Sequence, residues 1–340
     1  MLEKSKLLVL ENGKIINLMK SKIYPIADDA SFRKFYRAVS NKSSKIIVLS
    51  TREKYKNLIA YTAINKFLRI NRILAPKLYG HNFSRGIIVI QDFGDNSFHR
   101  ILIKKKKKLT IYKKLINLLI KIQKIKPRLK IKNVINGTHT IDKYSNKHLF
   151  KESDLFFDWY LPLILNKKKS LDIKKKSKKI LNKLYNKLNC FNSYFVHRDY
   201  HVQNLMKVGS KIGIIDSQDA LIGNPAYDLV SIIDDVRIKT SLKLKKQIYN
   251  YYLKKAQKIH KIDSSKFLED FNILSVQRSL KIIGIFSRLF KRDKKIKYLK
   301  LIPYTWQLLE TRMKPRIFLE LKKILDKNIH KNIRKKIINK

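Results

Sequence analysis

Hydrophobic and polar residues alternate along much of the first part of this chain. The runs 24–39 and 45–51 follow the alternation of antiparallel strands and are separated by a polar turn. Residues 53–71 place their apolar side chains at helical spacing, and the apolar run 86–94 is typical of a further strand. The pattern predicts a small β-rich region, residues 1–95, that contains one helix.

After this region the hydrophobic periodicity becomes helical. The expected helices are residues 107–125, 153–165, 173–188 and most of the chain from Pro225 onward. Residues 126–147, which proline and glycine interrupt, are predicted to form a long connection. We therefore expect an N-terminal lobe at 1–95, a larger helical lobe at 96–325 and a basic tail at 326–340. A chain of 340 residues, 44% of them hydrophobic, can bury a core in both lobes.

The segment 194–230 carries the main chemical signal. An apolar run leads into His-Arg-Asp, which ends at Asp199, and Asn204 follows five residues later. Two short β-rich runs then meet near Gly209, and Asp216 closes the second of them. The spacing predicts that an acid, an amide and a second acid converge on one point.

These three residue types suit phosphoryl transfer. The protein mainly has to position the moving phosphoryl group, neutralise its charge with Mg²⁺ and orient the attacking hydroxyl. Mg²⁺ prefers carboxylate, carbonyl and phosphate oxygens, so Asp216 and Asn204 are the candidate metal ligands. Asp199 precedes the amide at the offset of the H-R-D-x-x-x-x-N pattern, in which the Asp accepts the proton of the substrate hydroxyl. It is the candidate base.

The motifs HRDYHVQNLM at 197–206 and GNPAYDLVS at 223–231 resemble the aminoglycoside phosphotransferase and choline kinase superfamily. This resemblance implies an α+β, protein-kinase-like fold of two lobes, with a small antiparallel β N-lobe and a larger, mainly helical C-lobe. It also implies ATP and Mg²⁺ as cofactors. Protein kinases fit less well, because the D-F-G and A-P-E motifs are missing. The resemblance places Arg198 with Asp199 among the catalytic residues and makes Asp228 a structural brace of the loop, through Arg198.

Within the superfamily, the chain most resembles bacterial kinases that phosphorylate N-acetylmuramate and N-acetylglucosamine at the anomeric hydroxyl. Three further segments agree with them, 28–39, 89–98 and 152–161, so the resemblance spans roughly residues 25 to 240. It implies an ATP-dependent kinase whose acceptor is an amino sugar. Two alternatives remain: a kinase of aminoglycosides or of other small hydroxyl compounds, and a degenerate kinase fold that binds RNA or anionic surfaces.

The nucleotide side departs from the kinase pattern. The strand that begins at Lys45 has no lysine inside it, and the first turn has no glycine cluster. Arg33, Lys34 and Lys45 are the basic residues that remain as candidates for nucleotide contacts. Glu53 then has no lysine partner and is interpreted as a first-turn charge that suits the helix dipole. Ser217 stands where relatives tend to carry an aromatic residue.

Candidates for the acceptor side are Gln218, Asp219 and Trp159. The two polar residues follow the metal Asp, and an aromatic face can stack on a sugar ring, although Trp159 lies at the spacing of a core residue. His197 is expected to pack inside the loop. His201 suits either a shaping residue or a proton carrier.

The formal net charge of +53 would attract any polyanion at low salt. The lysines are spread along the whole chain among isoleucine and asparagine, which favours compositional drift over a dedicated nucleic-acid surface. We therefore expect a small-molecule partner and no dedicated nucleic-acid partner. The single cysteine, Cys190, excludes an intrachain disulfide, and no signal peptide or membrane span is expected, which favours the cytoplasm. The sequence leaves the oligomeric state open.

Overall fold

The computed structural model describes residues 9–11, 14–16, 21–26, 33–41, 43–50, 56–189, 192–259 and 262–335. The chain divides into two compact units. Unit 1 comprises residues 1–104, 128–141 and 202–220, and unit 2 comprises residues 105–127, 142–201 and 221–340. The predicted lobe boundaries at 95 and 325 remain predictions. In the described part of the chain, no helix combines the length and apolar character that crossing a membrane requires.

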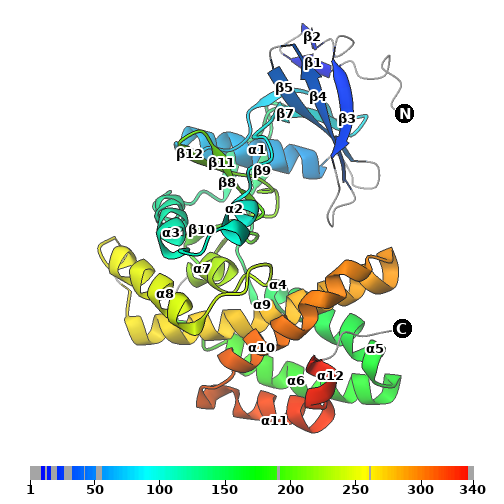
Figure 1. The fold of residues 1–340 in the computed structure, drawn as a ribbon, viewed down its shortest axis with the longest axis vertical. Coiled ribbons are helices and arrows are strands. Elements are labelled where there is room, and N and C mark those ends of the chain that lie inside the picture. The colour runs from blue at the N-terminus through cyan, green and yellow to red at the C-terminus, as the bar shows by residue number, and fades with distance from the viewer. Residues whose placement is uncertain are drawn as a thin grey trace. The chain divides into compact units, whose positions relative to one another are not determined.

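Unit 1 is built on a seven-stranded antiparallel sheet with the order β2-β1-β6-β7-β5-β4-β3 (Figure 1). Its strands are β1 (Val9–Glu11), β2 (Lys14–Ile16), β3 (Lys22–Ile26), β4 (Arg33–Ser40), β5 (Ser43–Ser50), β6 (Leu78–Asn82) and β7 (Ile87–Gln91). The alternating runs predicted from the sequence form β3, β4 and β5, and the predicted later strand is β7. The expected role of Glu53 lies outside the described residues.

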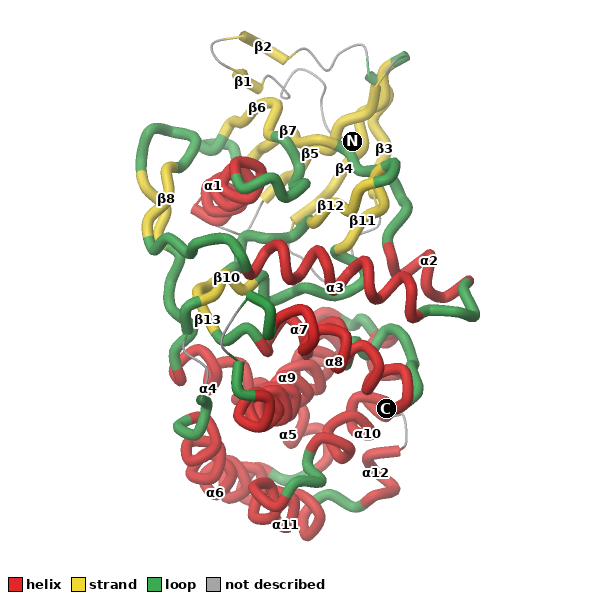
Figure 2. Tube along the Cα trace, turned by 90° about the vertical axis from the view of Figure 1, so that its left-hand side faces the viewer, coloured by secondary structure: helices red, strands yellow, loops and turns green. Residues whose placement is uncertain are grey.

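The alternation of side chains gives this sheet two apolar faces. Ile47 and Val89 belong to a cluster on one face, whereas Val48 and Ile88 belong to a cluster with α1 (Lys56–Ile70) on the other. Figure 2 shows α1 lying against the strands. Because both faces are covered, the central strand β7 is an almost continuous apolar run with its first four residues buried.

Three shorter elements complete unit 1: α2 (Phe98–Lys104), the hairpin β8 (Lys130–Lys132) and β9 (Thr138–Thr140), and the hairpin β11 (Leu205–Val208) and β12 (Lys211–Ile214). The long connection expected at 126–147 contains the paired strands β8 and β9, which were not predicted. Their three-residue strands are too short for a readable alternation. The Asn133 side chain, which accepts the N–H groups of Ile135 and Gly137, holds their turn.

Unit 2 is mainly helical, as predicted. Its helices are α3 (Leu109–Gln123), α4 (Asn146–Leu155), α5 (Leu161–Ile164), α6 (Lys167–Tyr185), α7 (Ala226–Ile233), α8 (Leu242–Ala256), α9 (Ser264–Asp293), α10 (Ile302–Arg312), α11 (Leu319–Asn328) and α12 (Lys331–Lys335). The short 3₁₀ helices η3 (Ile296–Leu301) and η4 (Arg316–Phe318) and the strand pair β10 (Tyr194–Val196) and β13 (Leu221–Gly223) complete it. Part of the predicted basic tail is folded in α12, where buried Arg334 pairs with Glu310 and Asp326.

The long helix α9 forms the centre of unit 2 and packs against α4, α7 and α10 (Figure 1). The helix expected at 153–165 is interrupted by the π-helix η2 (Phe156–Tyr160) between α4 and α5. Gly284 of α9 lets the backbones approach there, since a Cβ at this position would lie 2.2 Å from the Leu155 carbonyl carbon. A π-turn often marks a functional segment, and this one carries Trp159.

Candidate active site

The loop that carries Asp199 follows β10 in unit 2. The carboxylate of Asp228, fully buried on α7, accepts the backbone N–H of His197 at 2.7 Å and that of Arg198 at 3.0 Å. Asp228 thus contacts the loop through two amides. Its role as a brace stays a prediction, and the Arg198 guanidinium has another carboxylate as a partner.

That partner is Glu152 of α4, which is almost fully buried. The Glu152 carboxylate also accepts the ammonium of Lys281 at 2.8 Å and the hydroxyls of Tyr144 and Tyr227. These contacts satisfy a charge that burial would otherwise make costly. Their combined effect holds the pKa of the Glu152 carboxyl well below its usual range, although burial alone would raise it.

Asp199 lies among cations within unit 2. Burial alone would raise the pKa of its carboxyl, but the charges of Lys281 and Arg278 outweigh burial and hold that pKa well below its usual range. The carboxylate is therefore ionised at neutral pH. Its backbone carbonyl accepts the N–H of His201 at 2.9 Å.

Burial shifts the pKa values of His201 and Asp228 in opposite directions. Burial, together with the charge of Arg237, lowers the pKa of His201 to about 3, so its imidazole is neutral at pH 7. A neutral ring fits the shaping role better than that of a proton carrier. Burial raises the pKa of Asp228 to about 7, against the two backbone hydrogen bonds that favour its carboxylate.

The two candidate metal ligands flank the open end of the β11–β12 hairpin in unit 1. Asn204 directly precedes β11, Asp216 follows β12, and the N–H of Ile215 donates to the Asn204 carbonyl at 3.0 Å. Gly209 turns the hairpin with a positive φ of 57°, which glycine adopts without strain. The hairpin therefore brings a buried amide and a partly exposed carboxylate to one end of the same element, as the sequence predicts.

Of the three basic candidates, Arg33 is the one placed beside Asp216. Its Nη1 lies 3.8 Å from Asp216 Oδ1, and its side chain is buried. Lys34 is exposed and, as the next residue of β4, points to the opposite face. The Nζ of Lys45 lies 5.1 Å from the centroid of the Tyr79 ring.

The residue after Asp216 also has a defined role in unit 1. The buried hydroxyl of Ser217 donates to Asn65 Oδ1 of α1 at 2.6 Å. This hydrogen bond links the segment after Asp216 to α1, at the position where relatives tend to carry an aromatic residue. The Gln218 amide donates to the neighbouring Asp219 carboxylate at 3.1 Å near the surface. In unit 2, Trp159 is partly exposed on η2, whereas Tyr160 is buried and accepts a hydrogen bond from Trp306 at 3.0 Å.

Sequence reasoning did not single out Glu152, Arg278 and Lys281, which contact Arg198 or lie near Asp199 in the structure. Lys281 is flanked by apolar residues in its helix, but Glu152 and Arg278 have polar residues on both sides, so the neighbouring residues indicate burial for Lys281 alone. Among 78 lysines and arginines such a signal does not single out one residue.

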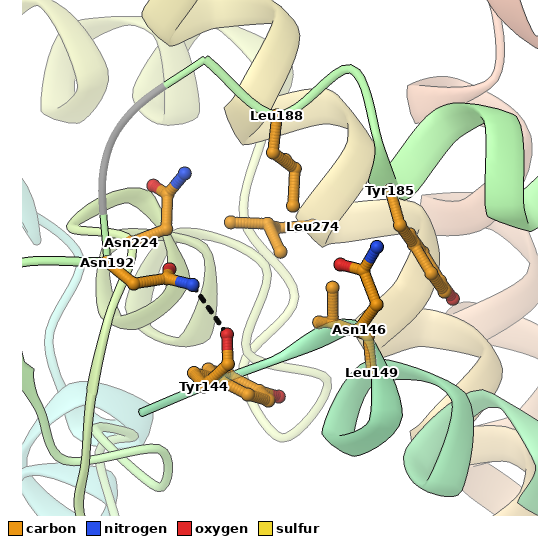
Figure 3. Close-up of a pocket in the computed structure, with 8 residues that line it drawn as sticks. All are labelled: Tyr144, Asn146, Leu149, Tyr185, Leu188, Asn192, Asn224 and Leu274. Atoms are coloured by element: carbon orange, nitrogen blue, oxygen red, sulfur yellow. Dashed lines mark hydrogen bonds between the residues drawn. The ribbon is translucent and has the colours of Figure 1, made fainter. Parts of the chain in front are cut away.

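A pocket of about 250 Å³ in unit 2 is lined by Tyr144, whose hydroxyl donates to Glu152 (Figure 3). Its rim includes the amides of Asn146, Asn192 and Asn224, and the Asn192 amide donates to the Tyr144 carbonyl at 2.6 Å. Tyr144 connects the pocket to Glu152 through its hydroxyl. None of the predicted site residues lines the pocket.

Comparison with known proteins agrees with this architecture. Residues 22–262 match the phosphotransferase enzyme family. The chain is similar to the N-acetylmuramate/N-acetylglucosamine kinase of Neisseria meningitidis serogroup B, with 27% identity over 284 residues that cover 82% of this chain and 81% of the relative. The enzyme of the same name from Pseudomonas aeruginosa is 27% identical over 295 residues, 86% of this chain and 83% of the relative.

Solved structures show the same fold. The amicoumacin kinase hAmiN in complex with AMP-PNP, Ca²⁺ and Ami superposes with a TM-score of 0.60 at 13% identity, covering 91% of this chain and 92% of that one. The predicted fold class, with an antiparallel β part and a mainly helical part in a protein-kinase-like fold, is confirmed. The chain is a small-molecule kinase that belongs to the phosphotransferase enzyme family.

Proposed function

We propose that the protein transfers the γ-phosphoryl group of ATP to a hydroxyl of an amino sugar such as N-acetylmuramate or N-acetylglucosamine. The observation that carries this proposal is the ionised Asp199, on a loop whose backbone is fixed by Asp228. The names of the curated relatives support the choice of acceptor. A reaction that consumes ATP favours the cytoplasm as its compartment.

In this proposal Asp199 orients the acceptor hydroxyl and takes its proton. The hydroxyl oxygen forms a bond to the γ-phosphorus, the bond to the bridging oxygen breaks, and ADP leaves. Since phosphoryl transfer passes through a loose transition state in most analyses, the proton moves late and a carboxylate of low pKa suffices as its acceptor. Orientation is then the main contribution of Asp199.

Asn204 and Asp216 would hold Mg²⁺ at the open end of the hairpin. One amide oxygen and one carboxylate are ligands that Mg²⁺ accepts while it keeps waters and phosphate oxygens. The Asp216 side chain is 44% exposed, which leaves it accessible to an ion and a nucleotide. The bound ion would neutralise charge on the phosphate oxygens.

The charges on α9 favour an anionic acceptor over a polycationic one. Lys281 and Arg288 are seven residues apart, so they share one face of this helix about two turns apart. Arg288 Nε has no hydrogen-bond partner among the described residues, and burial together with Arg292 lowers the pKa of its guanidinium. A sugar acid such as N-acetylmuramate would supply a carboxylate to Arg288, whereas an aminoglycoside would add positive charge.

The proposal is tested by incubating the protein with Mg²⁺ and ATP and with N-acetylmuramate, N-acetylglucosamine, choline or an aminoglycoside in turn. ADP and the mass of each acceptor are followed together. We expect a phosphorylated sugar and a higher kcat/KM for N-acetylmuramate than for N-acetylglucosamine. Absence of ADP with every acceptor, combined with RNA binding that weakens steeply with salt, would overturn the proposal in favour of a binding protein.

A further inference from the structure

Arg198 has a backbone conformation that a residue with a side chain adopts only when its surroundings hold it. Its φ is +70°, in the left-handed region. Asp199 follows directly, so the φ and ψ angles of Arg198 set the direction in which the Asp199 side chain leaves the backbone. The contacts that hold Arg198 therefore also fix the proposed base.

These contacts come from three different helices of unit 2. The Arg198 N–H donates to Asp228 of α7, and its carbonyl accepts from Arg278 Nη1 of α9 at 3.1 Å. The guanidinium pairs with Glu152 of α4 and lies over the Tyr144 ring, 5.7 Å from its centroid. The N–H group, the carbonyl and the side chain of Arg198 are thus held by contacts from three helices.

Glu152 is itself fixed from α9 by two groups. Lys281 Nζ lies 2.8 Å from Glu152 Oε1, and Gln277 Nε2 donates to Oε2 at 2.9 Å. Lys281 also donates to the Tyr227 hydroxyl at 3.2 Å. All three side chains are buried, so this part of the network is screened little by solvent.

We propose that Glu152 and Lys281 form a positioning pair that holds Arg198, and through it Asp199, from the side of α4. Neither residue touches substrate in this proposal, and Arg198 is itself a positioning residue, not a group that contacts the phosphates. The same carboxylate links α4, which leads directly into the π-helix that carries Trp159, to the loop of the base. The kinetic part of this inference rests on the proposed function.

Substitutions at position 198 test this positioning role most directly. Replacement of Arg198 leaves Glu152 paired with Lys281, so the fold keeps its charge balance, whereas Glu152→Gln leaves two buried cations without their carboxylate. Glycine adopts a φ of +70° without steric cost, and alanine does not. The pair Arg198→Gly and Arg198→Ala therefore separates the backbone conformation from the loss of the guanidinium.

We expect Arg198→Ala to lower kcat while the KM values of ATP and acceptor change little, and Arg198→Gly to recover kcat by roughly tenfold relative to alanine. Glu152→Gln should lower kcat much less in the Arg198→Gly background than in the unaltered protein. Lys178→Ala is the matched control, because it removes an ion pair to Asp154 of the same helix α4 but no contact of the network. It should leave kcat unchanged.

Two results would overturn the inference. Equal kcat for Arg198→Gly and Arg198→Ala would mean that the guanidinium itself acts on the reaction. An equal effect of Glu152→Gln in both backgrounds would mean that Glu152 does not act through Arg198.

Amide hydrogen exchange of the segment 194–201 tests the same inference without activity. Exchange of the His197 and Arg198 amides should be faster in Arg198→Ala than in the unaltered protein, and Arg198→Gly should restore part of the protection. Unchanged exchange in the alanine variant would contradict the inference. If the unaltered protein phosphorylated no acceptor, the proposed function would fail while this measurement still decided the positioning role.

Discussion

The loop of Asp199 and the hairpin end of Asp216 are held in opposite ways. In unit 2 the loop is fixed by buried partners, with Asp228 on its amides and Glu152 on its arginine. In unit 1 the Asp216 carboxylate is 44% exposed, and the Nη1 of Arg33 is 3.8 Å from it, beyond ordinary hydrogen-bond distance. The loop of Asp199 is held by buried groups, whereas the Asp216 carboxylate is partly exposed to solvent.

The difference follows from where each carboxylate obtains its counter-charge in the proposed reaction. A base has to be ionised and oriented when the acceptor arrives, so the protein itself supplies the cations Arg278 and Lys281. A metal ligand receives its counter-charge from the ion. The 3.8 Å contact of Asp216 with Arg33 competes less with such an ion than a close salt bridge between the same two side chains would.

The largest effect is expected at the fixed carboxylate. Asp199→Asn keeps the shape of the side chain but cannot accept the hydroxyl proton, so kcat should fall by about 100-fold or more, while ATP affinity changes little. Kinetics at saturating ATP, together with calorimetric titration of ATP, measures both quantities. If the Asp199→Asn variant retained most of its kcat, the assignment of Asp199 as the base would be contradicted.

Substitution of Asp216 should mainly weaken nucleotide binding. Asp216→Ala removes the only charged metal ligand that we propose, so affinity for Mg²⁺-ATP should fall by about tenfold or more. Asp219→Ala is the matched control, because this acid is three residues away and exposed. Equal losses in the two variants, measured by calorimetric titration with and without Mg²⁺, would contradict a metal role specific to Asp216.

The residue types and their spacing were enough to predict the β11–β12 hairpin and the helical character of unit 2, and the family resemblance implied the fold class. Alternation and helical periodicity are local properties, and the elements they describe here are long or bounded by turn residues. The π-turn at 156–160 and the β8–β9 hairpin were missed, because three to five residues are too few to show a period.

The candidate site shows a different limit of sequence reasoning. The offset between Asp199 and Asn204 identifies chemistry because loop chemistry is local in sequence. Glu152 and Lys281 lie in helices 46 and more residues from the loop, and only the fold brings them to Arg198 and to each other. A buried salt bridge between distant helices leaves no periodic signal in one sequence.

The pH dependence of stability offers a finer test of the fixed region. Asp228 has a pKa raised from 3.8 to about 7, so its stabilising contribution is complete below about pH 4 and is lost as the pH rises toward 7. His201 has a pKa lowered from 6.5 to about 3, so its contribution is complete above pH 6.5 and is lost as the pH falls toward 3. The two contributions oppose each other between these limits.

Single substitutions should separate the contributions of Asp228 and His201 to stability. Relative to the unaltered protein, Asp228→Asn should become more stable as the pH rises from 4.5 to 6.5, and His201→Gln should become less stable over the same range. Each slope is at most about 1.4 kcal/mol per pH unit. Chemical denaturation at several pH values measures the free energy of unfolding. Parallel curves for both variants would show that neither group titrates differently in the folded protein.

The smallest stability effect is expected at Arg33. In Arg33→Met, the loss of the 3.8 Å ion pair with the partly exposed Asp216 should change the free energy of unfolding by less than about 1 kcal/mol. Its effect on ATP affinity should exceed that of Lys34→Met, since the neighbouring lysine points to the opposite face of β4. Denaturation and nucleotide titration of this pair compare stability with binding at one site. Equal ATP affinities would remove Arg33 from the nucleotide side, and a large loss of stability would show that the Asp216 region is as rigidly fixed as the loop of Asp199.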